Sequence, residues 1–149
     1  MRSAICAFIL FALATASASA ECIDVRTSAL VKSAEILMLA RVDAAPNPAP
    51  DQPNFILGTY VVNVTVKTLW KGNTPRQIEF RQRFNPEEPP FWTSIGKDLV
   101  LSVRRLTPQR PLLVITPPVT SGFTAESCGW RLAEKVDLKD LGRGRLPEQ

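Results

Sequence analysis

Strict alternation of apolar and polar residues in the middle of the chain constrains the fold most. The segment GTYVVNVTVKTLWKG (58–72) alternates over most of its length, and RQIEFRQRF (76–84) repeats the pattern. A period of two puts successive side chains on opposite faces of a strand, so both segments predict strands with one buried face. The expected buried face carries Tyr60, Val62, Val64, Val66 and Trp70 in the first segment, and Ile78, Phe80 and Phe84 in the second.

Shorter strand candidates flank these two. They are AEILMLARV (34–42), KDLVLSVRRL (97–106), PLLVI (111–115) and a short final ESCGW (126–130). Five or six short strands separated by turn residues predict a small barrel or a sandwich. We favour a closed barrel, because closure removes the exposed sheet edge that an open sheet would leave.

The remaining segments predict helices, a loop and a tail. VRTSALVKSA (25–34) is either a short helix or an irregular lead-in, and AEKVDLKDLG (133–142) suits a short helix. DAAPNPAPDQPN (43–54) contains four prolines, which cannot donate to a sheet, so it is expected to be a long exposed loop. Residues 143–149 are expected to form a flexible C-terminal tail.

The first 20 residues have the form of a secretory signal peptide. A basic start at Arg2 is followed by an apolar run and by the small residues Ala18-Ser19-Ala20, an A-x-A cleavage site. The apolar run is shorter than a membrane-spanning helix requires. We therefore expect a secreted or periplasmic protein with one domain at residues 21–142 and no membrane anchor after cleavage.

The charge of the chain is only mildly basic. Without Arg2 the net charge is +3, and the densest basic group, Arg104-Arg105 with Arg110, fits the solvated ends of a strand and loop. This balance does not predict nucleic-acid binding.

Two cysteines remain after the signal peptide is removed, Cys22 and Cys128. An exported chain with exactly one such pair is expected to join them in a disulfide; two free thiols are the alternative. The closed loop would span 107 residues, which is worth about 4 to 5 kcal/mol as an upper value.

The composition excludes several kinds of catalysis. The sequence contains no histidine, so Ser-His-Asp and Cys-His mechanisms and imidazole-ligated zinc sites are excluded. The S-x-x-K motif at Ser94–Lys97 requires a helix, but Gly96 interrupts it. We expect no enzyme activity, no metal and no cofactor.

The order of these segments resembles a known module. An early cysteine, "SAEILMLARV", "GTYVVNVTVKTLWKG", "IGKDLVLSV" and a late "ESCGW" follow one another. This series is similar to the netrin-like module, the OB-fold barrel of the tissue inhibitors of metalloproteinases and their bacterial relatives. The resemblance covers nearly the whole mature chain. It implies an all-β, five- to six-stranded OB-fold barrel with short flanking helices and one disulfide.

The resemblance also implies a partner. In the animal inhibitors the terminal amine and carbonyl of a first cysteine chelate the catalytic zinc of the target protease. Here Glu21 precedes Cys22, and Ile23 and Asp24 stand where the inhibitors carry a second cysteine. On fold-level analogy, the resemblance suggests a metalloendopeptidase as one partner class.

The expected function is therefore that of an exported, non-catalytic protein-binding module, with protease inhibition as one form of it. The alternative is a structural or assembly accessory of the cell envelope. The candidate partner-binding residues are the N-terminal Glu21, Cys22 and Ile23, and the pair Phe91-Trp92, which lies in a proline-flanked polar loop and is expected to be exposed.

Overall fold

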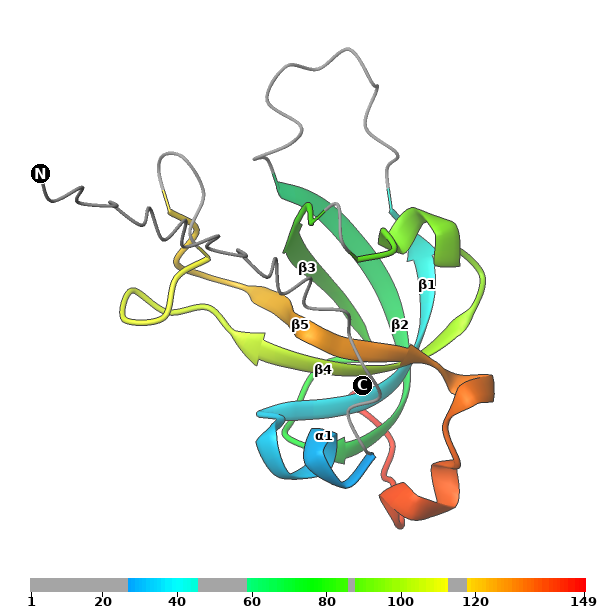
Figure 1. Ribbon diagram of the computed structural model, residues 1–149. Coiled ribbons are helices and arrows are strands. Elements are labelled where there is room, and N and C mark those ends of the chain that lie inside the picture. The colour runs from blue at the N-terminus through cyan, green and yellow to red at the C-terminus, as the bar shows by residue number, and fades with distance from the viewer. Residues whose placement is uncertain (1–26, 46–58, 86–87, 113–117) are drawn as a thin grey trace, which may run out of the picture.

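The computed structural model describes residues 27–45, 59–85, 88–112 and 118–149 (Figure 1). The segment expected to be a signal peptide and most of the proline-rich segment lie outside these ranges. The elements are α1 (Thr27–Ser33), β1 (Ile36–Ala44), β2 (Thr59–Lys71), β3 (Gln77–Arg83), the 3-10 helix η2 (Phe91–Ser94), β4 (Asp98–Arg105), β5 (Phe123–Leu132), and the 3-10 helices η3 (Ala133–Lys135) and η4 (Leu138–Leu141).

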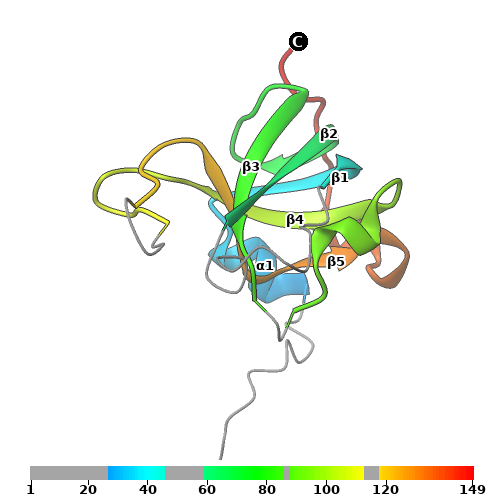
Figure 2. The same cartoon turned by 90° about the horizontal axis from the view of Figure 1, so that it is seen from above.

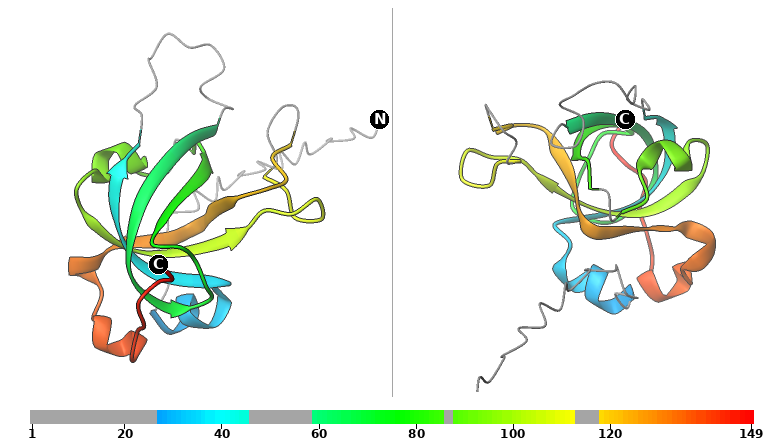
Figure 3. Two further views of the ribbon diagram at one scale, coloured as in Figure 1. Left: turned by 180° about the vertical axis from the view of Figure 1, so that it is seen from behind. Right: turned by 45° about the horizontal axis from the view of Figure 1, so that its top comes forward.

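The strands form one antiparallel sheet in the order β3-β2-β1-β4-β5. β1, β2 and β3 follow one another and β4 returns to lie beside β1, which is a Greek key. The sheet curls so that β5 approaches β3, where the buried Thr124 hydroxyl lies 3.5 Å from the Gln82 side-chain oxygen (Figure 3). The result is a nearly closed barrel, as the sequence predicts.

The alternation of β2 accounts for the barrel interior up to Val66 and then reverses. Lys67 and Trp70 are extra residues opposite β1, because Ala40 pairs with Val66 but Leu39 pairs with Thr68, and Met38 pairs with Leu69 but Leu37 with Lys71. An extra residue shifts the side chains that follow to the opposite face. Leu69 therefore enters the core, and the prediction that Trp70 shares the inward face is wrong.

A second apolar cluster lies outside the barrel, where α1 and η4 cover one side of the sheet. Leu37 of β1 and Val100 of β4 are fully buried there, and Trp70 packs against them while its indole N–H donates to the Gly142 carbonyl at 3.2 Å. β1 is thus covered on both faces, which explains why its sequence is a nearly continuous apolar run.

Three segment predictions need comment. The helical lead-in is α1, whereas residues 133–142 form two 3-10 turns instead of one helix, separated by the extended residue Val136. The final strand exists and runs from Phe123 to Leu132, longer than ESCGW. The strand expected at 111–115 falls mostly on residues 113–117, which lie outside the described residues; Leu112 forms a bridge with Val119.

The C-terminal segment has a defined place beside the β2–β3 turn, in contrast to the tail expected for residues 143–149 (Figure 2). Leu69 and Arg145 exchange two backbone hydrogen bonds of 2.8 Å, and Glu148 bonds to the backbone of Thr74 and Arg76. β3 pairs with β2 only as far as Thr65, so the segment satisfies backbone groups on β2 that β3 leaves unpaired.

Gly144 permits this close approach. A Cβ at this position would lie 2.1 Å from the Thr68 side chain and 3.2 Å from the Trp70 indole nitrogen. We expect Gly144→Ala to displace the segment and to lower the free energy of unfolding by about 1 to 3 kcal/mol, because several net hydrogen bonds are lost. Urea unfolding measures this free energy. Ser121→Ala, at an exposed turn, is the control; Gly142→Ala is not suitable, because Gly142 has a positive φ of 75°. An equal effect in Gly144→Ala and Ser121→Ala would contradict the placement of the C-terminal segment against β2.

Candidate functional site

Phe91 is a core residue, so the expectation that it is exposed is wrong. It opens η2, where only 1% of its surface is accessible. Its ring meets Phe80 edge to face at 5.2 Å and lies 5.1 Å from the Trp130 ring. The β3–β4 connection therefore places the Phe91 ring inside the barrel. The surrounding residues in the sequence are mostly polar or proline, so they do not indicate this burial.

Trp92 is the half-buried neighbour of Phe91. It stacks on Phe84 at 6.0 Å and meets Tyr60 edge to face at 5.2 Å. The Tyr60 hydroxyl accepts a hydrogen bond from the Phe91 amide at 3.4 Å. Burial raises the pKa of Tyr60 to about 12, although this bond opposes the shift. The phenol is therefore neutral at any physiological pH, and this end of the barrel is a packed aromatic cluster.

Glu21, Cys22 and Ile23 lie outside the described residues, so the structure places only Cys128 of the expected disulfide. Cys128 belongs to a bulge of β5, since Leu101 pairs with Trp130 but Val103 pairs with Ala125. Its φ is 55°, a left-handed conformation that is unfavourable for a residue with a Cβ. The Arg131 guanidinium donates to the Cys128 carbonyl at 3.0 Å. The disulfide stays a prediction.

The connection between β4 and β5 projects beyond the barrel, and we call its described residues, 106–112 and 118–122, the arm (Figures 1 and 3). Its root is closed by a 2.8 Å hydrogen bond from the Leu106 amide to the Gly122 carbonyl, and Thr107 and Arg110 pair across a tight turn. No described residue of 107–121 belongs to either apolar core cluster. The arm is therefore not needed to fill the barrel.

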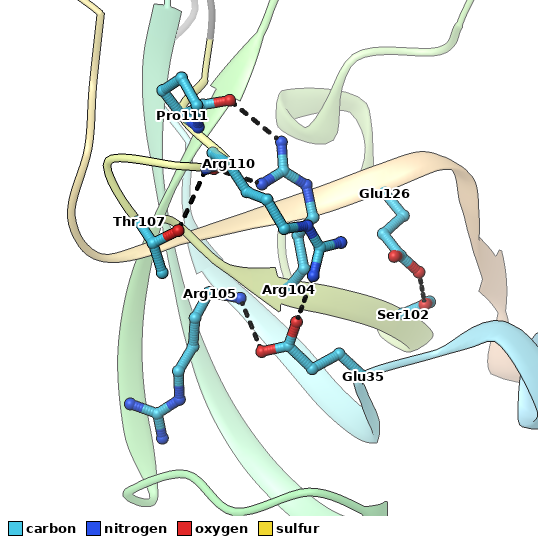
Figure 4. A network of polar contacts seen from close by, with 8 residues as sticks. All are labelled: Glu35, Ser102, Arg104, Arg105, Thr107, Arg110, Pro111 and Glu126. Carbon is cyan, nitrogen blue, oxygen red and sulfur yellow. Dashed lines mark hydrogen bonds and ion pairs between the residues drawn. The ribbon is translucent and has the colours of Figure 1, made fainter.

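A network of polar contacts holds the arm at its root (Figure 4). The Glu35 carboxylate accepts from the Arg110 guanidinium and from the Arg105 amide, both at 3.2 Å. The Arg104 guanidinium donates to the carbonyls of Arg110 and Pro111 at 2.8 and 3.3 Å. Glu35 thus connects the start of β1 with the arm, a contact between residues 70 or more positions apart that the sequence does not reveal.

Other cations at this end of the barrel are held by neutral carbonyl groups. The guanidinium of Arg105 donates to the Asn73 carbonyl at 3.2 Å, and that of Arg145 donates to the Gly72 carbonyl. Lys71 donates to two carbonyls at the end of α1. A carbonyl orients a cation without neutralising its charge. We use the name cationic end for the seven basic side chains of these segments: Lys32, Lys71, Arg76, Arg105, Arg110, Arg143 and Arg145.

Away from the second apolar cluster, the outer face around β1, β2 and β3 is polar. Asp98 accepts from Lys67 at 2.7 Å and lies 3.4 Å from Arg41, and a shallow hollow is lined by Asp43, Asn63, Val64, Gln77, Ile78 and Glu79. No aromatic side chain is among these residues.

The part of the chain that the structure describes contains no group of three or more histidine, cysteine, aspartate or glutamate side chains placed to hold a metal ion.

Ser94 is buried and its carbonyl accepts from the Lys97 amide at 3.0 Å, so the S-x-x-K residues form a turn and not a helix. The Ser102 hydroxyl donates to the Glu126 carboxylate. No helix in the described ranges has the length and apolarity to cross a membrane.

Comparison with known proteins gives no relative: a scan against family models, a search of curated proteins and a search of solved structures each found no match.

Proposed function

We propose that the barrel is an OB-fold of the netrin-like type and that the protein is an exported, non-catalytic binding module with a protein as its partner. A five-stranded, partly open Greek-key barrel is the general description of the OB-fold, and the strand order of this sheet agrees with it. Export rests on the signal peptide expected at residues 1–20.

The observation that carries the proposal is the arm. The arm is fastened at its root by Glu35 and Arg104, yet its described residues beyond Leu106, 107–112 and 118–122, belong to neither apolar core cluster. Connecting segments held by a rigid scaffold are where binding residues concentrate. The resemblance to the netrin-like module suggests a metalloendopeptidase as one partner class.

The test is a variant without the arm. Because the Leu106 amide bonds to the Gly122 carbonyl, an Asn-Gly turn can join these two residues in place of 107–121. The variant is expected to keep its β-type circular dichroism and to unfold cooperatively. Chemical cross-linking in extracellular or envelope fractions of the source cells, read by mass spectrometry, is expected to lose the partners that the intact protein captures.

Arg81→Ser/Arg83→Ser, on the exposed face of β3, is the control and is expected to capture partners normally. Equal capture by the armless variant would contradict the proposal. Titration of secreted metalloendopeptidases with excess protein then separates the two forms of the function. Loss of protease activity indicates an inhibitor, whereas capture of envelope proteins without inhibition indicates an assembly accessory.

A further inference from the structure

The cationic end concentrates the positive charge of a chain that is only mildly basic overall. The seven cations come from α1, the end of β2, the β2–β3 turn, the end of β4, the arm and the C-terminal segment. The contacts of two of them connect distant segments, because Arg105 and Arg145 both reach Gly72-Asn73. Two carboxylates lie among them. Glu35 pairs with Arg110, and Glu148 accepts from the Asn73 amide.

An exposed leucine projects from this end. Leu146 has 80% of its surface accessible, and Ile95, at 50%, is the other large apolar side chain exposed among the described residues. Leu146 directly follows Arg145, whose backbone is fixed to Leu69, and its position is fixed on the other side by the bonds of Glu148. The leucine is therefore held on the barrel and not on a loose tail.

We infer that the cationic end is a docking surface for a membrane rich in anionic lipids, with Leu146 as its apolar contact. Lys and Arg side chains near an anionic bilayer are attracted to the headgroups, and a leucine among them can enter the acyl boundary. A soluble anionic polymer would use the cations but would give Leu146 nothing to contact. The exposed apolar side chain directly beside Arg145 is what favours a lipid surface.

The docking is peripheral and reversible. Each cation near the surface increases the partition coefficient about fivefold. Ile95 and η2 lie at the opposite end of the barrel, because the amide of Gly96, next to Ile95, donates to the Val42 carbonyl near the end of β1. When the cationic end is docked, we therefore expect η2 and Ile95 to face away from the membrane. The inference does not depend on the arm's protein partner, and its test needs only lipid and purified protein.

The test is co-sedimentation of the full mature protein with vesicles of phosphatidylcholine alone or mixed with phosphatidylglycerol. We expect binding to the anionic vesicles that weakens in high salt, and none to the neutral ones. Leu146→Ser and Arg76→Ser/Arg143→Ser are expected to reduce the partition coefficient about tenfold or more. The side chains of Arg76 and Arg143 take part in no hydrogen bond or ion pair given above, so their removal leaves the fold intact, which thermal unfolding verifies.

The controls change the same chemistry at the other end of the barrel. Ile95→Ser removes the second exposed apolar side chain, and Arg81→Ser/Arg83→Ser removes an equal charge from β3; both are expected to bind as the parent does. Equal binding to neutral and anionic vesicles would overturn the inference. An equal loss of vesicle binding in the control variants would also overturn it. Unchanged binding by Leu146→Ser, together with full competition by dextran sulfate, would overturn it as well and would indicate a site for a soluble polyanion.

Discussion

Replacing Phe91 with alanine is expected to lower the free energy of unfolding by about 3 to 5 kcal/mol. The ring is almost fully buried and contacts Phe80 and Trp130 from inside the barrel, so truncation removes apolar contacts and leaves a cavity that the rigid strands cannot fill. A small domain has a total stability of about 5 to 15 kcal/mol, so the loss is a large fraction of it.

Urea unfolding followed by tryptophan fluorescence measures this loss, and Ile95→Ala is the matched control. Ile95 lies in the same connection but is half exposed, so its truncation is expected to change stability by about 0.5 kcal/mol or less. If Phe91→Ala were as stable as Ile95→Ala, Phe91 would not be a core residue, and its original assignment as a partner contact would be restored.

Removal of the expected Cys22–Cys128 disulfide is predicted to cost about 4 kcal/mol, the size of the chain entropy that a loop of 107 residues regains. Cys128 lies in the bulge of β5 with a φ of 55°. Chemical unfolding of the oxidised protein and of Cys22→Ser/Cys128→Ser measures the difference.

Mass analysis after alkylation establishes the bond itself. Protein isolated without reductant is expected to resist alkylation in its unfolded form and to gain two alkyl groups after reduction. Alkylation of both sulfurs without reduction would show that they are thiols. The single variant Cys22→Ser is expected to match the double variant, because either change prevents the cross-link.

Much of the barrel could be predicted from the sequence because its strands have a local signal. β2 and β3 alternate with a period of two, and that period alone specifies which side chains fill the interior. The signal failed at Trp70, where extra residues opposite β1 reverse the alternation. A bulge depends on the partner strand, so the sequence of β2 by itself does not contain it.

The candidate sites were harder to predict because they depend on long-range contacts. Phe91 stands among prolines and polar residues, and nothing local indicates that the segment folds back into the barrel. Glu35 and Arg110 are 75 positions apart, and Arg104, Arg105 and Arg110 resemble an ordinary solvated strand end. The cationic end exists only because segments far apart in the sequence meet beside the β2–β3 turn.

The central position of β1 has a consequence for how the chain reaches this structure. β1 is covered on both faces and pairs with β2 on one edge and with β4 on the other, and Arg41 meets Asp98, which is 57 positions away in the sequence. During synthesis β1 is therefore exposed before β4 has been made. Its apolar side chains and one backbone edge are then open to contact with other chains. Such non-local pairing slows folding and favours aggregation at high concentration. We expect the dilute protein to refold in milliseconds to seconds. The yield of refolded protein is expected to fall as the protein concentration is raised.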